Sequence, residues 1–483
     1  MVNCVKELLN NLCENKKVLI LGFGREGKST LKLLTSLCHV NMNITIGDKN
    51  KITEESISDA METACKYDIK KIAVSCGDDY LNNINDYDIV FKSPGIVLPK
   101  NIANYKAYIT SQTEEFLKVY RNRTVGITGT KGKSTVSTLA QKVLSDNGIE
   151  AVLGGNIGIP PFELVYAMEE NKNMNAILEL SCHQLEYLDV SPHISLYLNL
   201  YEEHLDHYGT YEKYAYAKNH IYMYQKSEDL LICKNDIIPF EEEFKEEIPH
   251  IITIHQDTAR KSIRAGIGKS NVCKAEKTIE ITQNIIKDED TGREEYLIPY
   301  NDIKLLGEHN YFNIAAVYLL GRHFNIDKTG FEMALKNFVP LSHRLENIGT
   351  INQVTYYDDS ISTIGETTIQ AVNSVKNVNT VLIGGMDRGI DYQQLEEFLS
   401  KKTVENVVLM YETGRRIYNE MKEKGFETDN IKVVHDLKEA VELAKRITKP
   451  GDACIMSPGA ASYGYFKNFE ERGQEFSRLV KSS

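Results

Sequence analysis

The stretch Val125-Gly-Ile-Thr-Gly-Thr-Lys-Gly-Lys-Ser-Thr135 decides the fold, because it joins an apolar run to a glycine-rich loop and then to a helical pattern over 134–144. Backbone N–H groups freed by Gly129 and Gly132 can face phosphate oxygens. The helix that follows adds its positive N-terminal end. This order of strand, loop and helix predicts a nucleotide phosphate loop.

The side chains at the end of the loop supply the remaining chemistry. Lys133 can neutralise the β/γ end of a nucleotide, and Ser134 or Thr135 can bind Mg²⁺. The spacing differs from the usual Walker pattern, since only two residues separate Gly129 from Gly132. A glycine turn with no ligand is the structural alternative, and the order of the parts favours phosphate binding.

Length and composition indicate a multidomain globular protein. The chain has 483 residues, and a prior of about 150 residues per domain suggests three domains. Hydrophobic residues make up 42% of the chain and charged residues 26%, as in folded globular proteins. The formal net charge of −12 argues against a general nucleic-acid binder, so we expect no nucleic-acid partner.

Cysteine usage and hydropathy predict the compartment. The nine cysteines are scattered, odd in number and include no C-x-x-C pair, which is typical of a reducing cytosol. The first residues form a charged, amphipathic stretch rather than a signal peptide, and no apolar run approaches the roughly 18 residues that span a membrane. We expect a cytoplasmic protein with no membrane partner.

The N-terminal part has the pattern of a dinucleotide-binding unit. An apolar run at 17–21 meets Gly22-Phe-Gly-Arg-Glu-Gly27 and a helical pattern over 28–37. A second strand, 43–46, leads to Asp48, about twenty residues after the glycines, where such folds place an acid on a ribose. Further strands at 89–91 and 108–109 flank a turn at 93–96. The alternative for the glycines is a helix–strand packing turn without a ligand.

Two more α/β units follow, and we place boundaries at 121 and 340. The predicted domains are 1–121, Rossmann-like; 122–340, a phosphate-loop ATPase; and 341–483, again Rossmann-like. Strands are expected at 176–180 and 193–200 in the second unit, followed by a helical region over 211–224 and a helix up to 320. The charge runs 241–243 and 288–290 are interpreted as solvated loops. Strands of the third unit are expected at 354–357, 380–383, 406–409, 431–434 and 452–456.

Two acidic and histidine-bearing segments stand at strand ends after the phosphate loop. Glu179 ends an apolar strand and can hold Mg²⁺ directly or through water, with a salt-bridged structural acid as the alternative. His204 follows the next strand and is a candidate ligand for a second Mg²⁺. Its rivals in the same segment are Glu202, Glu203, Asp206 and His207.

These motifs together resemble the Mur ligase family, over nearly the whole chain. Beyond the phosphate loop, the resemblance rests on Gly155-Asn-Ile-Gly158, Glu179-Leu-Ser181, Gln184-Leu-Glu186, 199–206, Gly307-Glu-His-Asn310, Ser342-His-Arg344, Asp359-Ser360, Gly384-Gly385, Ser457-Pro-Gly-Ala-Ala-Ser462 and Phe466-Lys-Asn-Phe469. It is closest to the members that add glutamate to UDP-N-acetylmuramoyl-L-alanine. The resemblance implies an ATP-dependent ligase of peptidoglycan precursor synthesis that forms an amide through an acyl phosphate, with two Mg²⁺ ions and small-molecule substrates. We expect a monomer.

The resemblance also implies roles for individual residues. Lys133, Glu179, His204 and Lys218 would be catalytic, and Ser134, Glu179, His204 and Lys218, the last as a carbamate, would hold the two metals. Without carbamylation, a lysine cation beside a metal would be repulsive. ATP would contact Gly129, Thr130, Lys131, Gly132, Lys133, Ser134, Thr135, Asn310, Arg344 and Asp359. The UDP-sugar would contact Gly24, Arg25, Glu26, Asp48, Ser93, Gly95, Asn156 and His204.

The glutamate pocket departs from the family pattern. Thr363, Ser462 and Phe469 match pocket positions, but Ile361-Ser-Thr-Ile364 stands where Lys-Ala-Thr-Asn is common, and Arg388 replaces the lysine expected after Gly-Gly. An arginine can still engage a carboxylate bidentately. D-glutamate is the expected substrate, with an L-glutamate-adding variant as the alternative. Cys182-His183 also replaces the usual small or aromatic pair.

Three other functions remain open alternatives. A ligase resembling folylpolyglutamate synthase would share the fold but leaves the N-terminal glycine-loop unit unexplained. A nicotinamide-binding protein fits the first glycine loop, but no hydride-transfer site follows it. A non-catalytic nucleotide-binding regulator is disfavoured because Lys133, Glu179, His204, Lys218 and Arg344 are all present together.

Overall fold

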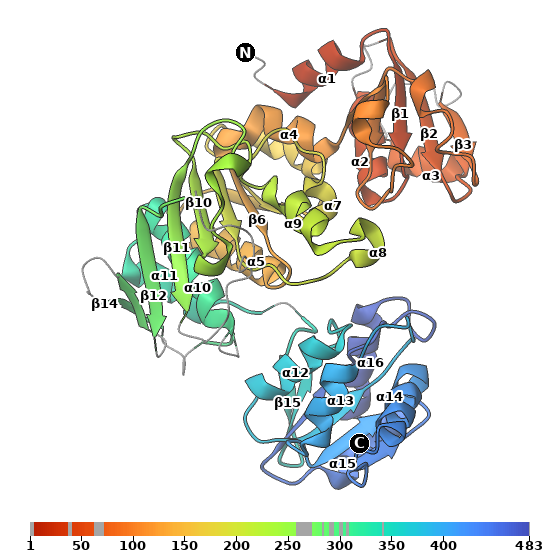
Figure 1. The fold of residues 1–483 in the computed structure, drawn as a ribbon, viewed down its shortest axis with the longest axis vertical. Helices are drawn as coiled ribbons and strands as arrows, with labels where there is room; N and C mark the ends of the chain where they lie inside the picture. The colour runs from red at the N-terminus through yellow and green to blue at the C-terminus, as the bar shows by residue number, and fades with distance from the viewer. Residues whose placement is uncertain are drawn as a thin grey trace. The chain divides into compact units, whose positions relative to one another are not determined.

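The computed structural model describes residues 4–36, 41–61, 72–256, 273–282, 285–288, 294–298, 303–305, 309–340 and 342–482. The chain divides into two compact units. The first combines Met1–Tyr300 with Tyr311–Asn337, and the second combines Asn301–Asn310 with Phe338–Ser483. Figure 1 shows helices and three sheets distributed over these units. The predicted α/β class is confirmed, and the boundaries at 121 and 340 stay predictions.

The first sheet is a parallel sheet of five strands in the order β3-β2-β1-β4-β5. The glycine loop leaves the carboxyl end of its central strand, β1, whose residues after Lys17 are all buried. Burial on both faces is typical of parallel strands covered by helices. The strands are β1 (Lys17–Leu21), β2 (Asn43–Asp48), β3 (Ala73–Cys76), β4 (Ile89–Lys92) and β5 (Tyr108–Thr110), and the helices are α1 (Val5–Cys13), α2 (Arg25–Ser36), α3 (Glu54–Ala60) and α4 (Gln112–Tyr120).

The second sheet has nine strands in the order β14-β13-β12-β11-β10-β9-β6-β8-β7. It is parallel from β12 to β7, and only its last two pairings, β12 with β13 and β13 with β14, are antiparallel. The strands are β6 (Thr124–Thr128), β7 (Ala151–Gly155), β8 (Asn175–Glu179), β9 (Ile194–Tyr197), β10 (Leu230–Lys234), β11 (His250–Gln256), β12 (Lys277–Thr282), β13 (Ile285–Asp288) and β14 (Glu294–Leu297).

The helices that accompany the second sheet come from both ends of its sequence. The phosphate loop runs from the buried strand β6 into the first of them, α5. They are α5 (Lys133–Asp146), α6 (Val165–Glu170), α7 (Cys182–Leu185), α8 (Leu205–Tyr208), α9 (Tyr211–Asn219), α10 (His309–His323) and α11 (Lys328–Lys336).

The second unit contains a six-stranded sheet in the order β15-β16-β20-β17-β18-β19, parallel except for the hairpin of β15 and β16. Its last helix shows why the helices form where they do: Asn468 caps it by accepting the N–H of Glu471 at 2.8 Å, and acids fill its first turn. The strands are β15 (Glu346–Ile351), β16 (Val354–Asp358), β17 (Val378–Ile383), β18 (Asn406–Leu409), β19 (Ile431–Val433) and β20 (Ala453–Met456), and the helices are α12 (Gly365–Ser374), α13 (Gln393–Ser400), α14 (Tyr411–Glu423), α15 (Leu437–Ile447) and α16 (Phe469–Lys481).

The predicted solvated loop at 288–290 is wrong at Asp288, because this residue ends β13, and β11 to β14 extend the second sheet. Asp288 is buried, and its carboxylate pairs with the ammonium of Lys277 across the antiparallel strands at 2.7 Å. Glu243 is also half-buried and accepts the hydroxyl of Tyr222 at 2.6 Å. A run of charged residues can therefore lie inside the fold when its carboxylates find partners there, as Asp288 does with Lys277. Residues 289 and 290 lie outside the described part of the chain.

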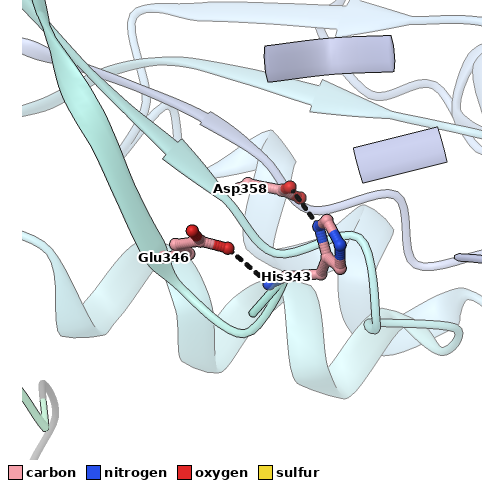
Figure 2. A group of neighbouring side chains, drawn as sticks. All are labelled: His343, Glu346 and Asp358. Atoms are coloured by element: carbon pink, nitrogen blue, oxygen red, sulfur yellow. Dashed lines mark hydrogen bonds and ion pairs between the residues drawn. The ribbon is translucent and has the colours of Figure 1, made fainter. Parts of the chain in front are cut away.

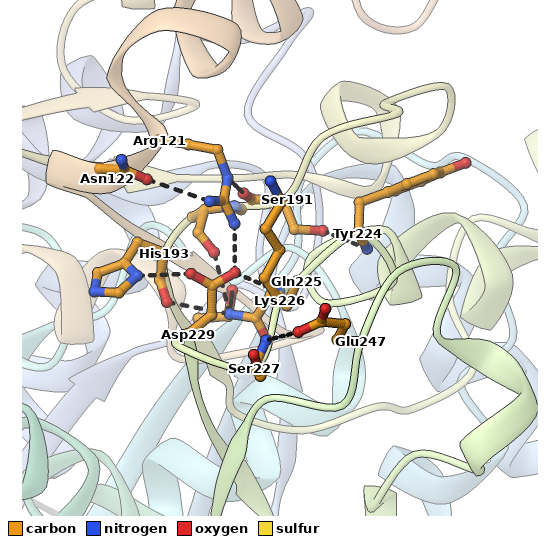
Figure 3. A network of polar contacts seen from close by, with 12 residues as sticks. Arg121, Asn122, Ser191, His193, Tyr224, Gln225, Lys226, Ser227, Asp229 and Glu247 are labelled. Carbon is orange, nitrogen blue, oxygen red and sulfur yellow. Dashed lines mark hydrogen bonds and ion pairs between the residues drawn. The ribbon is translucent and has the colours of Figure 1, made fainter.

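A buried carboxylate connects the amino ends of three neighbouring strands, β6, β9 and β10 (Figure 3). The side chain of Asp229 is 0% exposed. It pairs with the guanidinium of Arg121 and with Nδ1 of His193, the latter at 2.6 Å. It also accepts the N–H of Lys226 at 2.6 Å. This network lies at the opposite edge of the sheet from the phosphate loop.

Within the described ranges, no helix has both the length and the apolar composition needed to cross a bilayer.

Candidate active site

The phosphate loop turns into α5 at Gly132. This residue has φ 84°, in the left-handed region that favours glycine. A Cβ at this position would lie 2.9 Å from Oδ1 of Asn313, a buried side chain of α10. Both the backbone conformation and the close approach of Asn313 therefore require glycine here.

The segment after β9 holds the loop in place. Asn199 accepts the N–H of Lys131 at 2.8 Å and donates to the Lys131 carbonyl at 3.0 Å. The hydroxyl of Thr130 donates to the carbonyl of Tyr201 at 3.2 Å and accepts its N–H at 2.9 Å. These paired bonds fix the backbone of two predicted nucleotide-binding residues, Thr130 and Lys131.

The side-chain nitrogens of two lysines contact the same loop carbonyl. Lys133 donates to the carbonyls of Gly129 and Thr130 at 2.9 and 3.1 Å, and Lys218 of α9 donates to the Gly129 carbonyl at 2.9 Å. Burial lowers the pKa of Lys133. Lys218 is 1% exposed, and burial, with the charge of Lys133 as a second cause, lowers its pKa to about 7. An uncharged Lys218 amine is therefore well populated near neutral pH.

Glu179 places a carboxylate at the end of β8 with one oxygen left for a cation. The residue is 1% exposed, and its Oε1 accepts Nδ2 of Asn156 at 2.6 Å. Its Oε2 is buried and accepts no hydrogen bond from the described residues. Such an oxygen is stabilised by a cation or a water. With the hydroxyl of Ser134 at the start of α5, the donor set fits Mg²⁺, which prefers oxygen ligands.

His204 stands at the start of α8 in the left-handed conformation, with φ 57°. Its side chain is 44% exposed, and Nε2 lies 3.8 Å from a carboxylate oxygen of Glu203. The rings of His183 and Tyr214 lie 5.0 and 6.0 Å from its ring. The imidazole is thus held among aromatic groups at the loop while part of it faces outward.

The rivals of His204 are partly engaged elsewhere. His207 contacts Glu186 at 3.2 Å, and Glu203 pairs with the ammonium of Lys131 at 2.8 Å. Glu202 is exposed, and the side chain of Asp206 lies outside what the structure describes. These contacts support His204 as the ligand of this segment, and its role stays a prediction.

The structure supplies a physical account of Cys182-His183. The His183 ring stacks on His207 at 4.5 Å and meets the edge of the His204 ring, and its Nδ1 lies 3.2 Å from the sulfur of Cys182. Burial, followed by the charges of His207 and His204, lowers the pKa of His183 to about 3. An uncharged His183 therefore acts as an aromatic spacer between the two other histidines.

The predicted UDP-sugar residues of the first sheet gather at its carboxyl edge. Asp48 accepts the N–H of Phe23 at 2.7 Å, so this carboxylate shapes the glycine loop. Ser93 donates its hydroxyl to the carbonyl of Gly22 at 3.0 Å, which connects the 93–96 turn to the same loop. Gly24, between these contacts in sequence, is exposed.

Residues at the start of α2 contact the central part of the same unit. Glu26 accepts Nε2 of Gln184 at 2.8 Å, and burial raises its pKa. Arg25 donates to the carbonyl of Gly158 at 3.4 Å. Gly95 adopts φ 79° and lies beside the His183 ring. The structure thus brings the first glycine loop together with the segments that carry Asn156 and His204.

Asp359 follows β16 in the second unit and is buried. Its carboxylate accepts the hydroxyls of Ser362 and Ser457, the latter at 2.7 Å, and the N–H of Leu345 at 3.2 Å. Burial raises its pKa to about 6, against the lowering effect of these hydrogen bonds and of the Arg344 charge. Arg344 and Asp359 therefore belong to one electrostatic group.

The predicted glutamate residues also lie at a carboxyl edge, after β16, β17 and β20. Arg388 is exposed and donates to the carbonyl of Thr363 at 3.3 Å. The carbonyl of Phe469 accepts the hydroxyl of Ser360 at 2.8 Å, and Ser462 is buried. The structure brings Arg388 and Thr363 into contact, and their role in binding stays a prediction.

The predicted nucleotide ligands are divided between the units. Asn310 is buried in the first turn of α10, while Gly307 and Glu308 of its motif lie outside the described residues. Asn310, Arg344 and Asp359 belong to the second unit, and the phosphate loop belongs to the first. Their joint contact with a nucleotide therefore stays a prediction.

Two asparagines beside the loop received no role from the sequence. Asn199 bonds the loop backbone, and Asn313 packs against Gly132. Asn313 stands three residues after Asn310 on α10, a spacing that places both side chains on one helix face. That spacing is the signal by which Asn313 could have been found.

Comparisons with known proteins agree with this geometry. A model of the Mur ligase middle domain matches residues 127–321. The chain is 32% identical over 478 residues to the UDP-N-acetylmuramoylalanine--D-glutamate ligase of Clostridium botulinum strain Loch Maree, with 97% of each chain covered. It is 32% identical over 482 residues to the ligase of the same name from Acetivibrio thermocellus, again with 97% of each covered.

Solved structures share the fold at lower identity. UDP-N-acetylmuramate-alanine ligase MurC from Thermotoga maritima has a TM-score of 0.55 at 18% identity, covering 96% of this chain and 98% of that one. MurF ligase from the same organism, in complex with ADP, has a TM-score of 0.53 at 13% identity, covering 98% and 96%. With the near-complete coverage by curated relatives, these findings show that the chain belongs to the Mur ligase family.

Proposed function

We propose that this Mur ligase adds D-glutamate to UDP-N-acetylmuramoyl-L-alanine in peptidoglycan precursor synthesis, with ATP converted to ADP and phosphate. The observation that carries the proposal is the group formed by Lys133, Lys218 and Glu179 at the phosphate loop, in a chain whose relatives bear this activity in their names. The half-buried ammonium of Lys133, close to the buried carboxylate of Glu179, suits a reaction that brings anions together.

The reaction begins with transfer of the γ-phosphoryl group. A carboxylate oxygen of the L-alanyl group forms a bond to the γ-phosphorus, the bond to the ADP oxygen breaks, and an acyl phosphate results. The amine of glutamate then attacks the acyl carbon, and the tetrahedral intermediate expels phosphate and loses a proton to give the amide. Lys133 neutralises the approach of the two anions, and the loop backbone orients the phosphates.

Mg²⁺ would be held by Ser134 and Glu179, with a second ion at His204 and Lys218. When bound, such ions neutralise charge on the transferred phosphoryl group. The unpartnered Oε2 of Glu179 supports the first position. Asn156 keeps the other Glu179 oxygen in place through its 2.6 Å hydrogen bond.

Lys218 would hold its metal as a carbamate. Its neutral nitrogen attacks the carbon of CO2, a C–N bond forms, and one proton leaves the nitrogen, so that an anionic carboxylate replaces a cation. Two observations support this: Lys218 is buried against Lys133, and its pKa is lowered to about 7, which makes the reacting amine available. An ammonium in that position would repel both the metal and Lys133.

The substrates would be divided among three domains, 1–121, 122–340 and 341–483. UDP-sugar would occupy the carboxyl edge of the first sheet, where Asp48 and Ser93 shape the glycine loop. ATP would occupy the phosphate loop, and glutamate the edge that carries Arg388 and Thr363.

The amino acid is D-glutamate in this proposal, and L-glutamate is the second candidate. The curated relatives are D-glutamate ligases by name. The observation that favours the second candidate is the replacement of a family lysine by Ile361, with Arg388 as an exposed carboxylate-binding cation. The loss of a lysine at Ile361 and the arginine at 388 would change the positions of the positive charges available to the two carboxylates of glutamate.

We further propose a cytoplasmic monomer. The cysteines in the described ranges are all free, which fits a reducing compartment.

The test is release of phosphate from ATP in the presence of Mg²⁺, UDP-N-acetylmuramoyl-L-alanine and glutamate, with each component omitted in turn. The proposal expects release only when all are present, and loss of release in Lys133→Met. Lys142→Met is the matched control, because Lys142 lies on the same helix but pairs with Asp146 at its surface. Release that ignores the UDP-sugar, or that proceeds with a folate in its place, would contradict the proposal.

A further inference from the structure

His343 connects its own turn to β15 and β16 of the second unit through its backbone N–H and its imidazole, as Figure 2 shows. Nδ1 of His343 donates to Oδ2 of Asp358 at 2.7 Å, and Asp358 is buried at the end of β16. The backbone N–H of His343 donates to Oε2 of Glu346 at 2.8 Å, at the start of β15. The imidazole and both carboxylates therefore have direct hydrogen-bond partners.

Helix α16 closes the third side of this group. A Cβ on Gly473 would lie 2.1 Å from Nδ1 of His343 and 2.5 Å from Oδ2 of Asp358. The ligand atoms of His343, Glu346 and Asp358 all lie within 4.8 Å of one another, as in a metal site. These atoms are already hydrogen-bonded to one another, and Gly473 packs tightly against them. We therefore interpret the group as a packed connection between the turn, the sheet and α16, and not as a metal site.

The turn that this connection holds has an unfavourable backbone. His343 adopts φ 63° and Leu345 φ 47°, and both are non-glycine residues in the left-handed region. Such conformations persist only when their surroundings impose them. Leu345 donates its N–H to Asp359 at 3.2 Å, and the His343 carbonyl accepts the N–H of Ile361 at 3.1 Å. The residue between the two strained positions is Arg344.

We propose that His343 is a positioning residue, whose bond to Asp358 holds the strained 343–345 turn and with it the backbone of Arg344, a predicted ATP ligand. The inference rests on the proposed function, through the contact of Arg344 with ATP. Without this bond, we expect the turn to relax toward ordinary backbone angles and the backbone of Arg344 to move with it.

The charge of His343 adds to the connection. The charged groups that act on it are Asp358, Glu346 and Glu470, and Asp358 also interacts with the charge of Arg472. The hydrogen bond that His343 donates to Asp358 is the largest cause that raises the pKa of His343. The cationic form is therefore favoured below that raised pKa, and the ion pair weakens to a neutral hydrogen bond as pH rises through it.

The test compares His343→Ala with His343→Asn, because the asparagine side chain can place an amide N–H near the position of Nδ1. We expect His343→Ala to raise KM for ATP about tenfold, the effect of losing one charge-assisted hydrogen bond, with KM for UDP-sugar unchanged. His343→Asn should recover most of that loss. His435→Ala is the control, since His435 belongs to the same unit and its side chain is 74% exposed.

Asp358→Asn provides a second, independent readout. We expect KM for ATP in the unmodified protein to rise as pH increases through the raised pKa of His343, and this pH dependence to be reduced in Asp358→Asn. The same pH profile in both proteins would overturn the inference. Thermal unfolding of each variant shows whether it folds. Only the kinetics of variants that fold are used to judge the inference.

Arg344→Ala separates failure of the inference from failure of the proposed function. A raised KM for ATP in Arg344→Ala, with normal values in His343→Ala and Asp358→Asn, would overturn the inference alone. An unchanged KM for ATP in Arg344→Ala would overturn the proposed nucleotide contact, and the inference with it.

Discussion

At the scale of single residues, Gly132 and Gly148 offer a matched pair at the two ends of α5. Their φ angles are 84° and 78°, but a Cβ on Gly132 would meet Asn313 at 2.9 Å, whereas nothing lies within 4 Å of a Cβ on Gly148. Either alanine costs about 1–2 kcal/mol of backbone strain. Only Gly132→Ala should also distort the phosphate loop, so we expect it to raise KM for ATP at least about tenfold, a shift of 1.4 kcal/mol in binding.

Steady-state kinetics with ATP as the varied substrate, together with thermal unfolding, would check this expectation. Equal effects of Gly132→Ala and Gly148→Ala on KM would show that strain at the helix end, rather than the close packing of Asn313, controls the loop.

Lys218 carries the second prediction at the residue scale. Lys218→Ala should lower kcat on the order of 100-fold, because a supporting group of a metal site is lost. Lys213→Ala should keep normal activity, since Lys213 lies on the same helix, α9, and is exposed. The chemical test is a carbamate signal in ¹³C NMR after addition of ¹³C-bicarbonate, absent from Lys218→Ala. A signal that persists in that variant would refute the assignment to Lys218.

At the scale of structural elements, the buried network around Asp229 predicts a stability effect without a catalytic one. Asp229→Asn should lower the free energy of unfolding by about 3 kcal/mol, because Arg121 and His193 lose a buried anionic partner. The network lies at the amino ends of β6, β9 and β10, so KM for ATP should remain normal in the folded variant. Urea unfolding measures the first effect and kinetics the second.

The control for this prediction is Asp146→Asn, which removes the surface pair with Lys142 on α5. It should cost less than about 0.5 kcal/mol. A similar loss in both variants would mean that burial of Asp229 contributes little to its stabilising effect.

Local sequence predicted the elements whose apolar residues are contiguous. The runs that became β6 and β8 are almost fully buried, and their ends place the phosphate loop and Glu179. The run Lys277–Thr282 alternates polar and apolar residues and has no predicted strand, but it forms β12, and Ile279 and Ile281 face the core. The alternation is a local signal of a strand, but the pairing with β11 and β13 that buries this run depends on distant segments.

The candidate site divides in the same way. Lys133 and Glu179 are predictable because each stands at a fixed distance from a loop or strand end. Asn199 is engaged only because the segment after β9 folds back on the loop. The His343 connection needs a left-handed backbone at one position and a glycine of α16 against it, and both are set by tertiary packing.

At the scale of the whole molecule, predicted ligands of one nucleotide belong to two compact units. We therefore predict closure of the domains on substrate binding, with a hinge near 340–343, of which Leu341 lies outside the described residues. The radius of gyration measured by small-angle X-ray scattering should fall when a non-hydrolysable ATP analogue and UDP-N-acetylmuramoyl-L-alanine are both added. No change in the radius with both ligands bound would count against closure.

The most direct test of the central claim is to identify the product formed from ATP, Mg²⁺, UDP-N-acetylmuramoyl-L-alanine and either D- or L-glutamate. Mass spectrometry gives the amide product, and chiral analysis of its hydrolysate gives the enantiomer incorporated. The account predicts one new amide that contains D-glutamate, formed together with one ADP and one phosphate. Incorporation of L-glutamate alone, or no amide with either enantiomer, would contradict it.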